Sequence, residues 1–182
     1  MNAPLLANAK KVLAAYKARF PRRAKTIAGL ESLIASGADI TSRKEFRGHV
    51  VAGGVVLNDK GKILLIHHNI LQRWLPPGGH VEADDTSMLM AALREIEEET
   101  GLPSAQLVTV TGYESIPFCI EGHTIPTNPA KNEPEHTHWC FTWVFKLKSA
   151  ANVNLQLDEV GQYDWADSSR IPAHLKEAFL EI

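Results

Sequence analysis

Apolar residues recur every three or four positions over the first part of the chain, which is the spacing of one helical face. Residues 4–20 carry the first such stripe, and Pro21 ends it because proline does not continue a helix. Residues 24–36 carry a second stripe that stops before Gly37. We therefore expect a helical hairpin, which we assign to an N-terminal extension over residues 1–45.

From His49 onward the apolar positions form short runs rich in β-branched residues, separated by glycine, proline and asparagine. The first two runs flank the turn sequence 58–61, so they predict a β-hairpin. Strands are expected at residues 49–57, 62–68, 106–115, 137–147 and 162–167, helices at 87–100 and 172–182, and loops at 71–80 and 121–137.

These elements place residues 46–182 in one α/β domain, a length that suits a single core. Apolar residues make up 45% of the chain, yet no apolar run is long enough to cross a membrane. The N-terminus also lacks the apolar segment of a signal peptide. We therefore expect a cytoplasmic protein with no membrane partner.

The formal charge of −2 is unevenly distributed: residues 1–50 hold ten of the 19 Lys and Arg residues but three of the 21 Asp and Glu residues. A basic segment of this kind can face an anionic ligand or the acidic part of a partner subunit, although a solvated helical face is more common. A nucleic-acid interface would need a larger excess with interleaved aromatic residues. We expect no nucleic-acid partner and keep a homodimer as an alternative cover for the hairpin.

The segment LREIEEETGL, residues 93–102, places four glutamates in five positions of an expected helix. On a helical wheel, Glu95, Glu98 and Glu99 share one arc, roughly opposite the apolar stripe, while Glu97 points elsewhere. One interpretation is a solvated acidic face. The other is a site for a divalent cation such as Mg²⁺, because the segment has a single base and cannot neutralise three acids.

The loop that precedes this helix favours the cation. Gly78 and Gly79 allow the backbone to approach a ligand closely. A carbonyl of either glycine could join the metal, and their N–H groups could cradle a phosphate oxygen.

Together these features resemble the Nudix box, which reads G, five residues, E, seven residues and R-E-U-x-E-E-x-G-U, where U is apolar. REIEEETGL at 94–102 matches the second half completely. The first half departs from it, because the sixth residue after Gly79 is Asp85 and Arg94 lies one position too far along. Either Asp85 takes the role of the glutamate, followed by an inserted residue, or Thr86 stands in that place.

The resemblance extends over about residues 48–182 and implies an α/β/α sandwich with a mixed sheet. It also implies a hydrolase that cleaves a diphosphate linkage in a nucleoside diphosphate derivative, with Mg²⁺ or Mn²⁺ as cofactor. Pro117 resembles a marker of the branch that cleaves ADP-ribose. The resemblance implies that Arg94 orients the glutamates and that the metal ligands are Glu95, Glu98, Glu99 and a carbonyl of Gly78 or Gly79.

The general base varies within the family, so several glutamates remain candidates. They are Glu95, Glu114, Glu121, Glu133, Glu135 and Glu159.

Histidines form the other group of candidate site residues. His136 and His138 lie on one face of an expected strand, and His80 lies in the box loop. They could line a substrate pocket, form a structural pair, or bind zinc with His123 as third ligand. Trp74 could stack on a base, although core packing is the alternative. The expected substrate-binding residues are Trp74, His80, Glu82, His136 and His138.

Two other functions fit the same fold. One is a nucleotide-binding sensor module that has lost catalysis, which the altered first half of the box keeps open. The other is an isoprenoid diphosphate isomerase, which needs a catalytic cysteine in its own motif. The surroundings of Cys119 and Cys140 do not match that motif.

Overall fold

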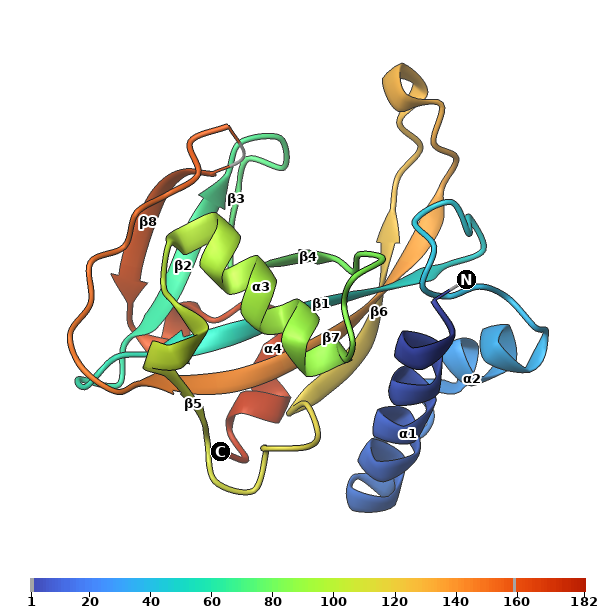
Figure 1. Cartoon of the computed structure of the whole chain (residues 1–182), viewed down its shortest axis with the longest axis horizontal. Helices are drawn as coiled ribbons and strands as arrows, with labels where there is room; N and C mark the ends of the chain where they lie inside the picture. Colours follow the sequence, from blue (N-terminus) through green and yellow to red (C-terminus); the bar gives the residue numbers. More distant parts are fainter. Residues whose placement is uncertain (1, 159) are drawn as a thin grey trace.

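A mixed β-sheet forms the centre of the protein in the computed structural model, which describes residues 2–158 and 160–182 (Figure 1). The described strands run in the order β3-β2-β1-β7-β5, while β4 pairs with β1, β6 with β7 and β8 with β2. Strands β1 (His49–Leu57) and β7 (His136–Leu147) are parallel, and the other pairs are antiparallel. The remaining strands are β2 (Ile63–His68), β3 (Arg73–Leu75), β4 (Gly78–His80), β5 (Leu107–Thr109), β6 (Cys119–Ile125) and β8 (Val160–Ala166).

Helices cover both faces of this sheet, as the alternation of side chains along β1 requires. Val50, Ala52 and Val56 face a core that includes residues of α1 (Ala3–Arg19), α2 (Ala28–Ala35) and α3 (Met88–Thr100). Val55 and Leu57 face a second core that includes residues of α4 (Ala173–Phe179). The expected α/β/α arrangement with an N-terminal helix pair is therefore confirmed (Figure 1).

Local signals place the ends of α3. The Ser87 hydroxyl accepts a hydrogen bond from the Met90 N–H at 3.2 Å, which caps the first turn. The helix ends at Gly101, whose φ of 66° is the left-handed conformation that glycine adopts readily. The helix expected at 87–100 is thus confirmed within one residue at its start.

Both expected loops are longer than the ones observed. Residues 71–80 contain β3 and β4, and β6 extends to Ile125, so the loop expected at 121–137 is reduced to the connection 126–135 between β6 and β7. The pairing of β6 with β7 extends from Cys119↔Thr142 to Ile125↔His136, so the longer strand β7 provides partners for a segment with weak strand propensity of its own. The strand expected at 106–115 is also shorter, since β5 ends at Thr109.

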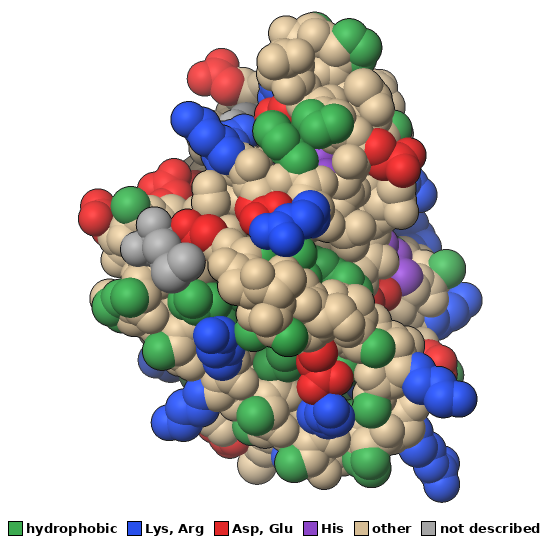
Figure 2. All heavy atoms as spheres, turned by 90° about the vertical axis from the view of Figure 1, so that its right-hand side faces the viewer, with side chains coloured by type: hydrophobic (Ala, Val, Ile, Leu, Met, Phe, Trp, Pro, Cys, Tyr) green, Lys and Arg blue, Asp and Glu red, His purple; other side chains and the backbone are tan. Residues whose placement is uncertain are grey.

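The N-terminal helices are part of the same apolar core as the sheet. Leu5, Ala9, Tyr16 and Leu30 have no exposed surface. Lys and Arg side chains are spread over the face that carries these helices, with apolar side chains between them (Figure 2). None of the helices in the described part of the chain has the length and apolar character needed to cross a bilayer. The domain division at residues 45 and 46 stays a prediction.

Deletion of residues 1–40 should expose a large apolar surface, because it removes the cover of one sheet face. We expect lower solubility or a changed oligomeric state, together with a lower melting temperature. Light scattering and a thermal melt of the truncated protein measure both. A truncated protein with unchanged mass in solution and unchanged melting temperature would show that the helices are dispensable.

Candidate active site

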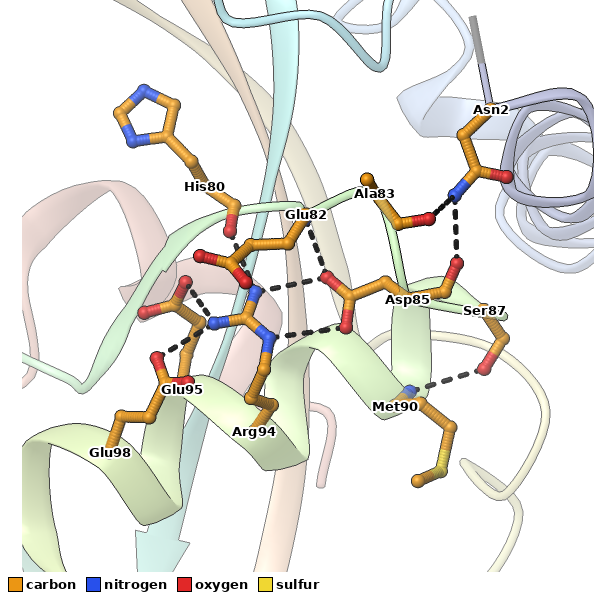
Figure 3. A network of polar contacts seen from close by, with 10 residues as sticks. All are labelled: Asn2, His80, Glu82, Ala83, Asp85, Ser87, Met90, Arg94, Glu95 and Glu98. Carbon is orange, nitrogen blue, oxygen red and sulfur yellow. Dashed lines mark hydrogen bonds and ion pairs between the residues drawn. The ribbon is translucent and has the colours of Figure 1, made fainter.

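The Arg94 guanidinium connects the acidic helix α3 to the loop that precedes it (Figure 3). Its Nε and Nη2 donate to the two carboxylate oxygens of Asp85 at 3.2 and 2.9 Å. Its Nη1 donates to Glu95 at 3.0 Å and to Glu98 at 2.8 Å. Nη2 also donates to the main-chain carbonyl of His80 at 2.8 Å. One side chain therefore fixes three carboxylates and the carbonyl at the end of β4.

Asp85, rather than Thr86, takes the place of the glutamate in the first half of the box. Asp85 is 7% exposed and holds Arg94 with both oxygens, whereas Thr86 is exposed. Asp85 also accepts a hydrogen bond from the Glu82 N–H at 2.7 Å. The shorter aspartate and the extra residue before the helix thus still produce a buried ion pair with Arg94.

The N-terminal helix α1 contacts this loop directly. The side-chain amide nitrogen of Asn2 donates to the main-chain carbonyls of Ala83 and Asp85 at 2.9 and 3.0 Å (Figure 3). The Asn8 side-chain oxygen accepts from the Met88 N–H at 2.9 Å, at the first turn of α3. The loop between β4 and α3 is therefore held from both sides, by Arg94 and by α1.

The charge of Arg94 is stabilised by its partners. Burial alone would lower the pKa of the guanidinium, but the hydrogen bonds to Asp85 and the charge of Glu95 outweigh it and raise that pKa. Arg94 is thus a permanent cation among acids.

The burial of Glu99 shows that the acidic arc of α3 does not lie where the helical wheel placed it. The arc is not opposite the apolar stripe but adjoins it, since Glu99 is 3% exposed and Ala91, roughly two turns earlier, is fully buried. The Glu99 carboxylate accepts from the Gly78 N–H at 2.8 Å. The reason is that β4 packs beside α3, so one side of the acidic arc faces the Gly-Gly turn.

The glycines of β4 allow this packing. Ala52↔Gly79 and Gly53↔Gly78 are paired between β1 and β4. A Cβ at Gly78 would lie 2.7 Å from the Gly53 Cα, and a Cβ at Gly79 would lie 2.5 Å from a carboxylate oxygen of Glu95. Glycine is required here by close approach, as the sequence suggested.

Gly79→Ala should therefore reduce activity more than stability, because the added methyl group displaces the Glu95 carboxylate from Arg94. A loss of about 10–100-fold in turnover is expected for a disturbed supporting contact. Gly161→Ala on β8 is the matched control, since its Cβ would meet the Asn69 side chain at 2.6 Å, away from Arg94. Equal turnover of both variants and the wild-type protein would contradict this role of Gly79.

The carboxylate oxygens around Arg94 are ligands of the type that a hard divalent cation prefers. Glu95, Glu98 and Glu99 offer carboxylate oxygens within one and a half turns of helix, and Mg²⁺ typically takes one or two carboxylates with water and substrate phosphate. The three do not form a compact group with oxygens within 4.8 Å of one another among the described residues. Water and substrate phosphate would supply the other ligands of such a cation.

A hollow lies beside this network. Its volume is about 370 Å³, which is in the size range of small-ligand pockets. It is bordered by Glu82, Asp84, Asp85, Thr86, Met90 and Arg94. Among the expected substrate-binding residues, Glu82 lies at this hollow.

The other histidine candidates meet elsewhere. The His80 ring points away from Arg94 although its carbonyl binds Arg94 (Figure 3). It approaches His138, with ring centroids 4.9 Å apart, and His136 lies next to His138. His49 joins them and was missed, because only the parallel register His49↔His138 brings the two strands together. His123, the expected third zinc ligand, instead lies with Glu121 and His174.

The imidazoles of His49, His80 and His138 are neutral at physiological pH, because burial lowers the pKa of each. Burial, together with the neighbouring His49 ring, lowers the pKa of His80 to about 4. Burial and the neighbouring His80 ring lower the pKa of His138 to about 3, and burial also lowers the pKa of His49. A neutral imidazole can accept a hydrogen bond or bind a metal ion.

Trp74 and three of the other general-base candidates have partners elsewhere. Trp74 packs against the second core, with His67 at 5.3 Å between ring centroids and the Arg170 guanidinium 5.6 Å from its ring. Glu159 lies outside the described residues. Of the other general-base candidates, Glu114 accepts from the Gly112 N–H, Glu121 contacts His123 and His174, and Glu133 pairs with Arg43 at 4.0 Å.

Comparison with known proteins gives consistent matches. A family model, described as NUDIX domain, matches residues 47–180. A probable DHNTP pyrophosphohydrolase from Lactococcus lactis subsp. cremoris is 29% identical over 153 residues, which cover 81% of this chain and 81% of that protein. A bis(5'-nucleosyl)-tetraphosphatase from Sus scrofa is 41% identical over 51 residues, which cover 28% of this chain and 34% of that protein.

Solved structures agree on the fold. A C. elegans Ap4A hydrolase superposes with a TM-score of 0.56 at 23% identity, covering 72% of this chain and 93% of that chain. The E. coli dihydroneopterin triphosphate pyrophosphohydrolase superposes with a TM-score of 0.55 at 17% identity, covering 73% of this chain and 93% of that chain. At such identities the likeness concerns the fold alone.

Proposed function

The chain belongs to the Nudix family, and from this premise we propose that it hydrolyses a phosphoric anhydride bond in a nucleoside diphosphate derivative, with Mg²⁺ or Mn²⁺ held by carboxylates around Arg94. The observation that carries the proposal is the Arg94 network, which joins Asp85, Glu95, Glu98 and the His80 carbonyl. An acidic surface without such a function would need no half-buried arginine to order it.

Each residue of the Arg94 network has its own proposed role. Glu95 and Glu98 would hold the cation together with a carbonyl of Gly78 or Gly79, and the Glu99 carboxylate fixes the Gly78 N–H. When bound, such a cation neutralises charge on the phosphate oxygens and lowers the pKa of the attacking water. Arg94 keeps Glu95 and Glu98 in place through its hydrogen bonds, and Glu95 remains our candidate general base.

The substrate class rests on the relatives. The similar proteins named above act, by their names, on dihydroneopterin triphosphate and on dinucleoside tetraphosphates. We therefore propose a small nucleotide or nucleotide-like polyphosphate as substrate, with ADP-ribose among the candidates because of Pro117. The proposal places the enzyme in the cytoplasm.

A substrate panel tests the proposal. The purified protein is incubated with Mg²⁺ and ADP-ribose, a dinucleoside tetraphosphate, a pterin triphosphate or simple nucleoside triphosphates, and the products are separated by chromatography. We expect cleavage at an anhydride bond of at least one compound. Binding without turnover on every compound would instead favour the sensor module.

A further inference from the structure

Four histidines from three strands meet on the sheet face that carries α4. His49 has the same position in the alternation of β1 as Val55 and Leu57, which face α4. His138 is its partner in the parallel strand β7, and His80 is on β4. The carboxylates at Arg94 project from α3, which covers the other face. The histidines therefore form a group separate from the proposed active site.

The spacing of these rings suits a metal ion. His49, His80 and His138 each present one ring nitrogen, and the three nitrogens lie within 4.8 Å of one another. Zinc–nitrogen bonds of about 2.0–2.1 Å in a tetrahedron place ligand nitrogens about 3.4 Å apart. Ring rotations that move each nitrogen by roughly 1 Å would therefore bring the three nitrogens to the spacing of tetrahedral zinc ligands.

The hydrogen bonds of His49 orient it as a ligand. Its Nδ1 lies 3.3 Å from the Glu45 carbonyl, so this nitrogen carries the proton and donates. Its Nε2 is then a bare acceptor, and this buried atom has no hydrogen-bond partner, in a side chain that is 1% exposed. An unpartnered buried acceptor costs free energy, which a bound cation would recover. A backbone carbonyl that fixes one ring nitrogen is typical of metal-binding histidines.

His136 shows the same orientation. Its Nδ1 lies 2.8 Å from the Pro134 carbonyl and donates to it, which leaves Nε2 as an acceptor 3.1 Å from the His138 Nε2. This ring is thus placed to support His138 or to act as a further ligand. Access exists from outside, since His80 and His138 are partly exposed. The nearby Arg43 cation is offset by Glu133, 4.0 Å from it.

We propose that His49, His80 and His138 form a binding site for a transition-metal ion of the class that prefers imidazole, with Zn²⁺ as the representative ion. Three imidazoles leave a fourth tetrahedral position for water, His136 or a small anionic ligand. Mg²⁺ prefers oxygen ligands, so this site and the carboxylates at Arg94 select different ions. The assignment gives His80, His136 and His138 a role other than contact with the nucleotide base.

The test measures metal content and does not depend on turnover. The metal-free full chain is dialysed against micromolar Zn²⁺, and bound zinc is determined by mass spectrometry. We expect one zinc per chain in the wild-type protein. His80→Gln or His138→Gln should raise the dissociation constant at least about tenfold. His80→Gln leaves its main-chain carbonyl bond to Arg94 in place.

Two control variants separate this site from the other candidates. His174→Gln alters the group of Glu121, His123 and His174, and Glu98→Gln alters the carboxylates at Arg94. Both should bind zinc like the wild-type protein. The proposal is overturned if the wild-type protein takes up no zinc, or if zinc is lost in a control variant and kept in the His80 and His138 variants. A thermal melt of each variant verifies folding, and either histidine variant alone decides the outcome.

Discussion

Glu98→Gln should lower the turnover number by about a hundredfold or more while leaving the protein folded. In our proposal Glu98 holds the cation that neutralises charge on the reacting phosphate, so its loss should exceed the cost of about 10–100-fold for a supporting contact. The Glu98 side chain is 47% exposed, and its ion pair with Arg94 contributes little to stability at such exposure. Steady-state kinetics and a thermal melt of the variant measure both effects.

Glu97→Gln is the matched control, because it removes the same charge from the neighbouring position. The Glu97 carboxylate accepts from the Ser104 N–H at 3.1 Å and belongs to the connection after α3 rather than to the Arg94 network. We expect turnover within about twofold of the wild-type protein, since a surface change of this kind has small effects. Equal turnover of the Glu97 and Glu98 variants would exclude Glu98 as a metal ligand.

Arg94→Met should destabilise the fold and also impair activity. The substitution leaves the Asp85 carboxylate, whose side chain is 6% exposed, without its cationic partner. Breaking a buried ion pair costs about 3–5 kcal/mol in free energy of unfolding. Because Arg94 is partly exposed, we expect a loss of about 3 kcal/mol. For a chain of this size the melting temperature should fall by roughly 6–12 °C. Turnover should fall because Glu95 and Glu98 lose their common donor.

The control for this prediction is Arg47→Met, which removes an exposed arginine from its pair with Glu45. Its effect on stability should stay within about 0.5 kcal/mol. The double variant Arg94→Met with Asp85→Asn should recover part of the lost stability, because the buried charge is then removed with its partner. A double variant no more stable than Arg94→Met would show that the ion pair with Asp85 is not the source of the effect.

The local parts of the site could be predicted from the sequence, because neighbours along the helix determine them. Ser87 and Gly101 bound α3, and the position of Arg94 four residues before Glu98 was enough to expect their ion pair. The helical wheel of α3 did not predict that Glu99 is buried. That depends on how β4 packs beside the helix, and a helical wheel contains no information about that neighbour.

The long-range parts of the structure could not be predicted in the same way. His49 stands 89 positions from His138 by their residue numbers, and the two meet because β1 and β7 are in parallel register. Nothing near His49 marks it as a site residue. Strand β6 was missed for a related reason: Glu121, Gly122 and His123 are poor strand formers, and their pairing with β7 overrides that preference.

Strand β4 connects the two proposed sites. The main-chain carbonyl of His80 accepts from Arg94, whereas the His80 ring belongs to the histidine group on the opposite face. A change in the position of this short strand would therefore reach both groups. Separate measurements of zinc content and of turnover, on the same variants, keep the two proposals independent.

The dependence of hydrolysis on Mg²⁺ tests the central claim most directly. Turnover of a cleaved substrate from the panel is measured while Mg²⁺ is varied, with the chelated protein as the starting point, for the wild-type chain and for Glu98→Gln. The account predicts no turnover in the chelated wild-type protein, full recovery with Mg²⁺, and a requirement for at least about tenfold more Mg²⁺ in Glu98→Gln. Turnover that persists without the cation, or the same Mg²⁺ requirement in both proteins, would contradict it.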